Sequence, residues 1–505
     1  MTECHNVEKT CWNCPAAKLE GNVDFRGCGQ SKEKLNDEDK QTLIECKRRK
    51  ELGHFEPTIK FEQCPEWEEG DYGYQLKDMR VLILGMEGYL GWALALKLAN
   101  HGFEVMGVDN HLRRETVSEK GSHSIVPIED METRLEAAKE VLGVDIGFEE
   151  MDYTDKKELG KLLKEFKPES IVHYAEIPSA PYSMVDGEHA HRVQENNTLG
   201  TLKLLWAMKE HCPEASLVKL GTMGEYGAPL TGRPLFEGVF PADAAVQWEG
   251  REWSLGGELT PRNPPSFYHV SKVQDTYNVY EACKYWWLRS YDIMQGVIFG
   301  VHTEEVSQDP RLRTRLDVDE WFGTVINRFV SQAVSDVPLT VYGKGEQARG
   351  FIGLEDAMQC MVRLINSPPE PGEYGVVNQV SGVYKIKELA DAVADVTSDR
   401  LDKEVKIQRI ENPRVESDKH PIEVVSRNLP NEFGFERKVE LKEEIGRMVQ
   451  LLSKDDIQER IEKVKKKIIP ETQWSGEKKE PDIIEIYEPG TKDHGNYQTV
   501  LNTGR

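Results

Sequence analysis

The stretch "ILGMEGYLGWALALKLANHGFEVMGVDN", from Ile83 to Asn110, constrains the fold more than any other part of this chain. It has the pattern of a buried strand, a glycine-rich turn, a helix and a second strand. Gly85, Gly88 and Gly91 provide the missing side chains that a tight turn, a close pyrophosphate and a close helix–strand contact each require. The start of the helix offers N–H groups and a positive dipole end to the phosphates. The stretch therefore predicts a dinucleotide-binding unit.

The end of the second strand indicates which dinucleotide is bound. Asp109 closes that strand, where a carboxylate can accept hydrogen bonds from both ribose hydroxyls of NAD. Arg113 and Arg114 follow, and arginine can hold the 2′-phosphate of NADP. Because Asp109 would repel that phosphate, we favour NAD as the cofactor. The stretch "MDYTD", with Asp152 and Tyr153, is a candidate adenine contact, and a surface loop is its alternative interpretation.

Apolar runs recur between amphipathic segments along the rest of the chain, as "FEVMGVD", "ESIVHYAE", "ASLVKLGT" and "YDIMQGVIFG". This alternation predicts an α/β fold, namely a Rossmann doubly wound parallel sheet with a smaller C-terminal substrate-binding lobe. We expect residues 1–78 to form a cysteine-rich N-terminal extension and residues 79–300 the NAD-binding domain. Residues 301–470 would form the second lobe, interleaved with that domain, and residues 471–505 a polar tail.

The charge of the chain argues against one class of partner. Its 88 acidic and 64 basic residues give a net charge of −24, whereas phosphate backbones require a basic surface. We therefore expect no nucleic acid partner. The first residues, "MTECHNVEKT", lack the pattern of a signal peptide, and no run of about 18 apolar residues predicts a membrane span. The expected location is the cytoplasm.

Six of the nine cysteines precede residue 79. An odd number in a chain expected in the cytoplasm argues against a disulfide framework. Cys11 and Cys14 in "CWNC", with Cys28, offer three thiols to zinc or an iron–sulfur cluster, and the fourth ligand would be Cys4, His5, Cys46 or Cys64. No second CxxC supports this interpretation, so unliganded thiols are the alternative and our prediction includes no metal.

The stretch "SFYHVSK" predicts the chemistry. Tyr268 and Lys272 are four residues apart and would share one face of a helix. The ammonium, together with the positive ring of oxidised nicotinamide, would lower the pKa of the tyrosine. The phenolate could then accept a proton from a sugar hydroxyl, and the lysine could also bond the nicotinamide ribose. Thr222, at the end of the strand in "KLGTMGEYG", could hydrogen-bond the same hydroxyl oxygen.

These features resemble the extended short-chain dehydrogenases/reductases that act on nucleotide sugars. Within them, the chain is most similar to the UDP-sulfoquinovose synthase family, and the similarity spans roughly residues 79 to 420. The stretches that carry it are "GYLGW", "VDNHLRR", "SAPYSM", "VKLGTMGEYG", "SFYHVSK", "QGVIFG", "RLDVDEWFGTVINRF", "LTVYGKGEQARGFI" and "ENPRVE".

The resemblance implies a reaction. That family converts UDP-glucose and sulfite to UDP-sulfoquinovose with NAD that stays bound. Oxidation at C4 acidifies the C5 proton, and water is lost across C5–C6. Sulfite adds at C6, and the hydride then returns to C4. The resemblance also implies a homodimer.

The resemblance also implies roles for individual residues. Tyr268 would be the C4 base, Lys272 its partner and Thr222 a hydrogen-bond donor to the C4 oxygen. The expected NAD-lining residues are Tyr89, Leu90, Asp109, Asn110, Arg113, Arg114, Asp152 and Asn197, beside the three glycines. The expected substrate residues are Met223 and His269 near C6, Gln295 at the sugar, Arg349 at the diphosphate, and Arg414 and Glu416 at the uridine.

The chain departs from its relatives at two places. Ile177 and Pro178 replace a Gln–Arg pair of the family, so either another cation substitutes (His269, Arg192 or Lys219) or the C6 acceptor differs. Met223 and Gly224 stand where related 4,6-dehydratases carry an Asp–Glu pair, which argues against a plain dehydratase.

Three questions stay open at this point. Glu225 could be a base or a buried bonding partner. A nucleotide-sugar 4-epimerase that does not use sulfite is the alternative enzyme. A non-catalytic protein that binds NAD or a nucleotide sugar is the alternative of another class.

Overall fold

The computed structural model describes residues 79–227, 232–414, 422–471, 474 and 482–487, together with two short strands near the N-terminus. The chain divides into two units, Met1–Lys77 and Asp78–Arg505. In the first unit, β1 (Lys18–Glu20) and β2 (Asn22–Asp24) form an antiparallel pair. The six N-terminal cysteines and the possible metal ligands among them lie outside the described residues, as does most of the predicted tail.

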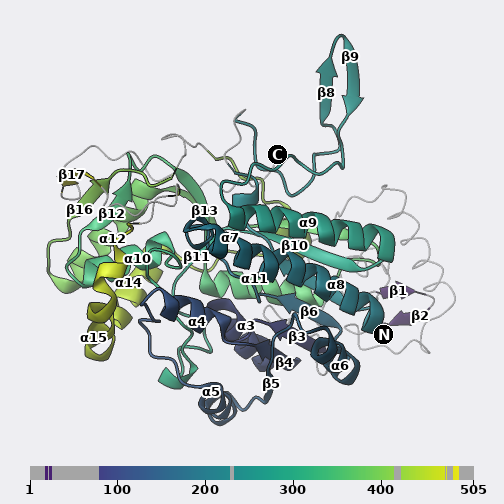
Figure 1. Cartoon of the computed structure of the whole chain (residues 1–505), viewed down its shortest axis with the longest axis horizontal. Helices are drawn as coiled ribbons and strands as arrows, with labels where there is room; N and C mark the ends of the chain where they lie inside the picture. Colours follow the sequence, from purple (N-terminus) through teal and green to yellow (C-terminus); the bar gives the residue numbers. More distant parts are fainter. Residues whose placement is uncertain are drawn as a thin grey trace, which may run out of the picture. The chain divides into compact units, whose positions relative to one another are not determined.

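Seven parallel strands form the central sheet of the second unit (Figure 1). Their order is β14-β10-β7-β6-β3-β4-β5, so the chain starts in the middle of the sheet and winds outward in both directions. Most of these strands are buried apolar runs, as parallel strands covered on both faces must be. Their bounds are β3 (Arg80–Leu84), β4 (Glu104–Asp109), β5 (Ile146–Glu150), β6 (Ser170–His173), β7 (Ser216–Leu220), β10 (Arg289–Gln295) and β14 (Tyr374–Gln379).

Helices cover both faces of this sheet, which confirms the predicted doubly wound Rossmann fold. One layer contains α6 (Lys156–Phe166), α8 (Gly200–His211) and α9 (Phe267–Trp286), which pack side by side. In the other layer α3 (Tyr89–Asn100) packs against α11 (Leu354–Asn366). Additional helices are α4 (Leu112–Glu119), α5 (Met131–Ala137), α7 (Gly187–Gln194) and α13 (Asn428–Phe433).

The C-terminal lobe has two small sheets. One has the order β11-β13-β15 and the other β12-β16-β17. Four helices, α10 (Val325–Val334), α12 (Ile386–Leu401), α14 (Leu441–Leu452) and α15 (Asp455–Val464), contribute to a separate apolar core. The strands are β11 (Val297–Phe299), β12 (Leu339–Tyr342), β13 (Ala348–Gly353), β15 (Gly382–Lys385), β16 (Ile407–Ile410) and β17 (Ile483–Tyr487).

The run "YDIMQGVIFG", which reads as one strand in the sequence, is divided between the two lobes. β10 belongs to the central sheet, and β11 begins after Gly296 and belongs to the C-terminal lobe. A Cβ atom at Gly296 would lie 2.8 Å from the carbonyl oxygen of Gly350. The glycine therefore allows the two chain segments to approach where the strand changes sheets, and the chain passes between the lobes at this point.

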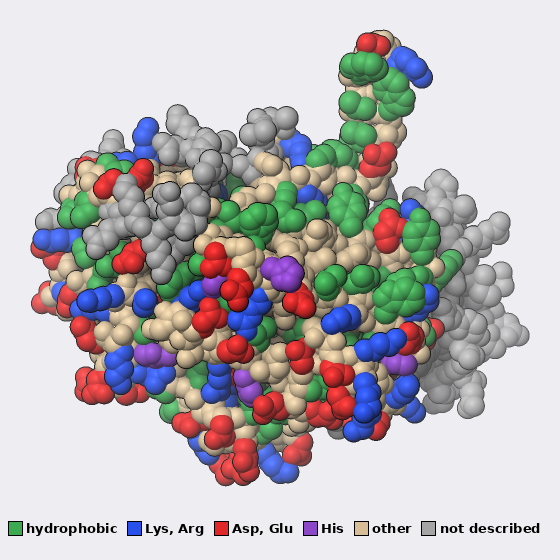
Figure 2. Space-filling model, viewed as in Figure 1, with side chains coloured by type: hydrophobic (Ala, Val, Ile, Leu, Met, Phe, Trp, Pro, Cys, Tyr) green, Lys and Arg blue, Asp and Glu red, His purple; other side chains and the backbone are tan. Residues whose placement is uncertain are grey.

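A β-hairpin projects from the unit (Figures 1 and 2). It consists of β8 (Ala245–Trp248) and β9 (Arg251–Ser254), whose residues are all exposed. Val246 pairs with Trp253 and Trp248 with Arg251, which places the large apolar side chains on one face of the hairpin. Among the described residues, every helix is too short or too polar to cross a membrane.

Candidate active site

A cavity of about 740 Å³ lies at the carboxyl ends of the central strands and extends to the C-terminal lobe. Ligands of open parallel sheets bind at this edge. The predicted residues that line the cavity are Gly85, Gly88, Tyr89, Leu90, Gly91, Asp109, Asn110, Arg113, Tyr153, Thr222, Met223, Tyr268, His269, Lys272, Gln295, Arg349 and Arg414. The structure thus brings residues from across more than 300 positions of sequence to one cavity.

The glycine loop has the shape that a pyrophosphate requires. Gly85 has a φ of +86°, which favours glycine. A Cβ atom at Gly91 would lie 2.1 Å from the carbonyl oxygen of Gly85, so the first turn of α3 rests directly on the loop. The first turn of α3 lines the cavity together with the loop, and this cradle fits the phosphates of NAD.

Substituting Gly91 with alanine is expected to weaken NAD binding about 10- to 100-fold. The added methyl group would overlap the Gly85 carbonyl, and overpacking of this kind typically costs about 1–3 kcal/mol. Calorimetric titration of cofactor-free protein with NAD would measure the effect. Gly187→Ala is the matched control, because nothing lies within 4 Å of its Cβ position. Equal NAD affinity in the two variants would contradict this account of the loop.

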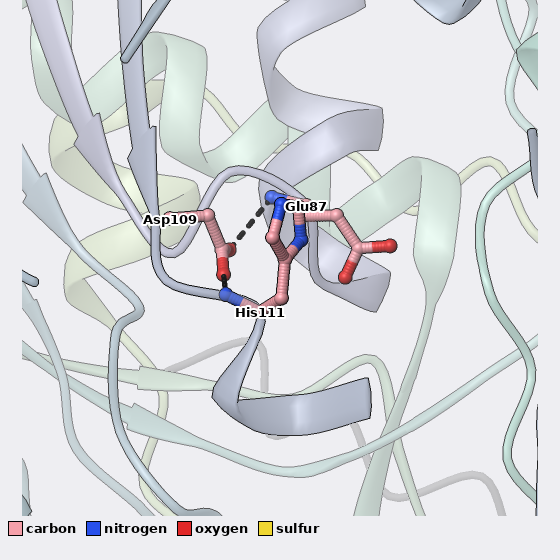
Figure 3. A group of neighbouring side chains, drawn as sticks. All are labelled: Glu87, Asp109 and His111. Carbon is pink, nitrogen blue, oxygen red and sulfur yellow. Dashed lines mark hydrogen bonds between the residues drawn. The ribbon is translucent and has the colours of Figure 1, made fainter. Parts of the chain in front are cut away.

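The carboxylate of Asp109 is fixed at the end of β4. It accepts hydrogen bonds from the backbone N–H groups of Glu87 (2.9 Å) and His111 (2.7 Å), as Figure 3 shows. Burial and the nearby Glu87 carboxylate raise the pKa of Asp109. The side chain lines the cavity beside the glycine loop, which is where an adenosine ribose would lie in a dinucleotide bound to that loop.

Glu87, Asp109 and His111 lie close enough together to form a metal-binding group, but the charge of Glu87 is already compensated. Its carboxylate is 2.7 Å from Arg114, 3.3 Å from Arg315 and 3.7 Å from Arg134. A carboxylate surrounded by three guanidinium groups has little charge left for a cation. The group is explained by these ion pairs, and Glu87 connects the glycine loop to α4 and α5.

Both arginines after β4 are engaged by acids, and their positions differ. Arg113 lines the cavity, donates to Asp317 (2.8 Å) and stacks on Phe322 at 4.0 Å. Arg114 does not line the cavity, because its side chain turns to Glu87. The prediction that Arg114 lines NAD is therefore not supported by its position.

Two other predicted NAD residues also lie away from the cavity wall. Asp152 is exposed and accepts a hydrogen bond from the N–H of Thr154, as in a simple turn. Asn197 is fully buried and bonds both the N–H and the carbonyl of Ile177. Asn197 thus supports the loop after β6 rather than facing a ligand. Glu416 lies outside the described residues.

Tyr268 and Lys272 lie in the first turns of α9, which begins after Ser266 as N-cap. Both line the cavity. Lys272 is buried and pairs with the carboxylate of Glu176, and Asp275 lies 4.0 Å from its ammonium. This pairing was not anticipated from the sequence.

The electrostatics of Tyr268 differ from the expectation that Lys272 lowers its pKa. In the protein alone the pKa of Tyr268 is raised, first by burial and then by the charge of Glu176. The ammonium of Lys272 is neutralised by Glu176, so it gives the phenol little net help. The positive charge of oxidised nicotinamide would have to supply the lowering.

Thr222 lies two residues after β7 and caps the short helical turn Met223–Glu225. Its Oγ1 accepts a hydrogen bond from the N–H of Gly224 (3.1 Å). Because a hydroxyl can accept and donate at the same time, its hydrogen can still be donated to a ligand. Glu225 is fully buried, accepts from Thr276 (2.9 Å) and lies 3.7 Å from Lys219. Because its side chain is enclosed by these partners, the structure favours Glu225 as a buried bonding partner over a base.

His269 explains the glycine at position 224. A Cβ atom at Gly224 would lie 2.1 Å from Nε2 of His269, so only glycine leaves room for the ring. Nδ1 of His269 is hydrogen-bonded to Ser266 (2.8 Å). Burial and the positive charges of Arg414 and Arg349 lower the pKa of His269 to about 3. The ring is therefore neutral at physiological pH.

The three proposed substitutes for the missing family arginine are now placed. His269 lines the cavity but is uncharged. Arg192 bonds Glu115 and Glu119 away from the cavity, and Lys219 is buried against Asp292. The cationic residues among those lining the cavity are Arg113, Lys272, Arg328, Arg349 and Arg414.

Among the cavity residues that sequence reasoning missed are Glu176, Arg328, Tyr342 and Trp474. The guanidinium of Arg414 lies 5.6 Å from the ring of Tyr342 and 5.0 Å from that of Trp474, and Arg328 lies 5.5 Å from Tyr342. The Nε atoms of both arginines are buried and have no hydrogen-bond partner among the described residues. Buried donors of this kind normally meet an acceptor, and a phosphate would satisfy them.

The fold and the site are those of an NAD-binding enzyme of the extended short-chain type. The chain belongs to the NAD dependent epimerase/dehydratase family, which matches residues 81–378. It is 41% identical over 396 residues to the UDP-sulfoquinovose synthase of Sulfolobus acidocaldarius, which covers 78% of this chain and 98% of that protein. It is 40% identical over 341 residues to the chloroplastic UDP-sulfoquinovose synthase of Spinacia oleracea, covering 68% and 69% of the two chains.

Solved structures agree on the fold. The UDP-glucose 4-epimerase from Bifidobacterium longum, in complex with NAD+ and UDP, superposes with a TM-score of 0.57 over 75% of this chain and 99% of that chain. The UDP-glucuronic acid 4-epimerase from Bacillus cereus, in complex with UDP-glucuronic acid and NAD, gives 0.53 over 76% and 100%. Their identities of 17% and 19% support the fold alone. The family assignment confirms NAD as the cofactor and the chain as an enzyme.

Proposed function

We propose that this chain is a UDP-sulfoquinovose synthase, which converts UDP-glucose and sulfite to UDP-sulfoquinovose and water with no net redox change. The observation that carries the proposal is one cavity that joins the glycine loop to Thr222, Tyr268 and Lys272. The 41% identity to a protein of that name over nearly its whole length supports the choice of substrates.

NAD would lie in the part of the cavity that is lined by the glycine loop and the end of β4. The glycine loop and the N-terminus of α3 would hold its phosphates, and Asp109 would accept the ribose hydroxyls. When bound, NAD supplies an acceptor for the C4 hydride of the sugar and later returns it. Lys272 would bond the nicotinamide ribose from its position on the cavity wall, where it pairs with Glu176.

The chain's own groups would move the C4 proton. Tyr268 would take it from the hydroxyl during oxidation and give it back at the end of the cycle. The hydroxyl of Thr222 would donate to the C4 oxygen. With C4 at the ketone level the C5 proton becomes acidic, and loss of water across C5–C6 creates the double bond that sulfite attacks at C6.

The nucleotide end of the substrate would bind at the C-terminal lobe. Arg349 and Arg414 line that part of the cavity, and the buried Nε atoms of Arg328 and Arg414 have no hydrogen-bond partner in the described part of the chain. A guanidinium group matches phosphate oxygens in a fork. We assign the diphosphate to this group of arginines and the sugar to the region between it and Tyr268, next to Gln295.

Sulfite would approach C6 beside Met223 and the neutral His269. Ile177 and Pro178 bring no charge to this part of the cavity. The positive potential that favours an anion there would come from Arg349 and Arg414, which also lower the pKa of His269. His269 would act as a hydrogen-bonding group and not as a cation.

The function is tested by incubating the purified protein with UDP-glucose, with and without sulfite, and analysing the sugar nucleotides by mass spectrometry. The expected result is a product heavier and more acidic than UDP-glucose that forms only with sulfite. UDP-galactose formed in the absence of sulfite would instead support the 4-epimerase, which needs Thr222, Tyr268 and Lys272 but no C6 chemistry. Recovery of UDP-glucose alone, with no reduction of bound NAD, would leave the non-catalytic alternative.

A homodimer and a cytoplasmic location complete the proposal. The α8–α9 surface exposes large aromatic side chains, among them Trp206, Tyr277 and Tyr285, and exposed patches of this kind mark association surfaces. Light scattering after size exclusion would give the mass of the particle, against 57.6 kDa for one chain.

A further inference from the structure

Glu176 is a charged residue of the cavity that the predicted chemistry does not use. It follows β6 by three residues, and its side chain is 5% exposed. One carboxylate oxygen pairs with the ammonium of Lys272. The other is buried, has no hydrogen-bond partner among the described residues, and lies 3.6 Å from Nε2 of His173. A carboxylate buried to this degree is retained only where its charge has a purpose or a partner.

The partner of Glu176 is the lysine on which the tyrosine chemistry depends. Lys272 is 1% exposed, so its ammonium needs a counter-charge to remain protonated. Glu176 is the stronger of its two acidic neighbours, because Asp275 lies farther away at 4.0 Å. The contact fixes where the ammonium sits on the cavity wall, since α9 and the loop after β6 each contribute one end of it.

We propose that Glu176 is a positioning residue that holds Lys272 in place and sets the pH range in which Tyr268 can accept the alcohol proton. The inference rests on the proposed function, because it concerns the C4 oxidation step. Glu176 acts through Lys272 and through its own charge, with no contact to the reacting atoms required.

The direction of the effect follows from the charges around the phenol. The charged or titratable groups that face Tyr268 or Glu176 are Glu176 and His173 from β6 and its loop, Lys219 and Glu225 from β7 and the turn after it, Lys272, Asp275 and His269 from α9, and the phenol of Tyr153. Among them, Glu176 opposes ionisation of Tyr268 most strongly, after burial itself. In Glu176→Gln the carboxylate of Asp275 remains as counter-charge to Lys272, so the ammonium stays protonated with less of its charge compensated, which favours the phenolate further.

The test compares Glu176→Gln with wild type in the holoprotein. The rate of cofactor reduction by UDP-glucose is measured as a function of pH in single turnovers. Because Tyr268 must be deprotonated to act as base, the rate rises with pH, and a lower pKa moves that rise to lower pH. We expect a shift of about 1 pH unit or more in the midpoint, on the order of the effect of a nearby charge.

Two further variants separate charge from shape. Glu176→Asp keeps the charge but shortens the reach to Lys272, so its midpoint should stay near that of wild type while its rate falls. Glu188→Gln, at an exposed position in the first turn of α7, makes the same change in net charge and should leave both midpoint and rate unchanged. A purely structural role for Glu176 would lower the rate in both substitutions at this position and shift neither midpoint.

A second measurement does not depend on the substrate. The difference in tyrosinate absorbance between the holoprotein and its Tyr268→Phe variant reports the titration of Tyr268. The same difference is then measured between the Glu176→Gln variant and the double variant Glu176→Gln, Tyr268→Phe. A lower midpoint in the presence of Glu176→Gln supports the inference, and an unchanged midpoint overturns it. If UDP-glucose fails to reduce the cofactor in wild type while this spectroscopic shift is present, the proposed function fails and the role of Glu176 stands.

Discussion

Tyr268→Phe is expected to reduce the rate of cofactor reduction by UDP-glucose about 10³-fold, within the range for loss of a positioned acid–base group. Phenylalanine keeps the ring that packs against the apolar cluster containing Ile177, Tyr182 and Phe322 but removes the oxygen that would take the C4 proton. Binding of NAD and of UDP-glucose should change little, because the cavity keeps its lining. Stopped-flow absorbance of reduced nicotinamide, with calorimetry for the two affinities, measures both effects.

Tyr277→Phe is the matched control on the same helix. Tyr277 is 47% exposed, and the loss of its hydroxyl should leave turnover at the wild-type level. Turnover of the Tyr268 variant within about threefold of wild type would show that the proton goes to another group, and the assignment of the whole catalytic site would then have to be withdrawn.

The sequence predicted the parts of this protein that depend on local pattern. The glycine loop is recognisable because two of its glycines meet requirements that other side chains would violate, namely the positive φ of Gly85 and the 2.1 Å approach at Gly91. The buried strands are recognisable because both faces of a parallel sheet are covered. Tyr268 and Lys272 could be paired because a helix places residues four apart on one face.

The remainder of the site depends on contacts between distant segments, which no local pattern encodes. Glu176 and Lys272 are 96 positions apart, and a lone glutamate after a strand gives no sign of its partner. Trp474 lies in a polar stretch with no periodicity, yet its ring stacks near Arg414. Conversely, Asn197 lies in a short π-helix between α7 and α8 that places its side chain in the core. The sequence contains no signal for this π-helix.

Tyr268 lines the cavity as predicted, but the reason given for its reactivity was incomplete. The spacing to Lys272 indicated a lowered pKa, but the structure adds a carboxylate that cancels the ammonium. A phenol that holds its proton in the protein alone is suited to the last step of the proposed cycle, in which it returns a proton to C4. The charge that shifts it toward a base would come with the oxidised cofactor, so acid and base roles would alternate with the cofactor's oxidation state.

Glu87→Gln is expected to have the second large effect, a loss in the free energy of unfolding. Glu87 is fully buried and compensates Arg134, which is also fully buried with its guanidinium 4.2 Å over the ring of Trp92. Burial lowers the pKa of Arg134 to about 9, and the charge of Glu87 limits that fall. Removing one partner of a buried ion pair typically costs about 3–5 kcal/mol, since the other charge stays in a poorly solvated site.

The loss is measured as the change in apparent free energy of unfolding in urea, on wild-type and variant holoprotein in parallel. Glu169→Gln provides the control, because Glu169 pairs with Arg80 at 3.6 Å on the surface and is half exposed, where such a pair contributes about 0–1 kcal/mol. Equal, small losses in both variants would mean that the arginines around Glu87 find solvent or other acceptors. A large loss confined to Glu87→Gln would show that the loop binding the cofactor phosphates is anchored through this carboxylate, and that the glycines shape a turn which Glu87 holds in place.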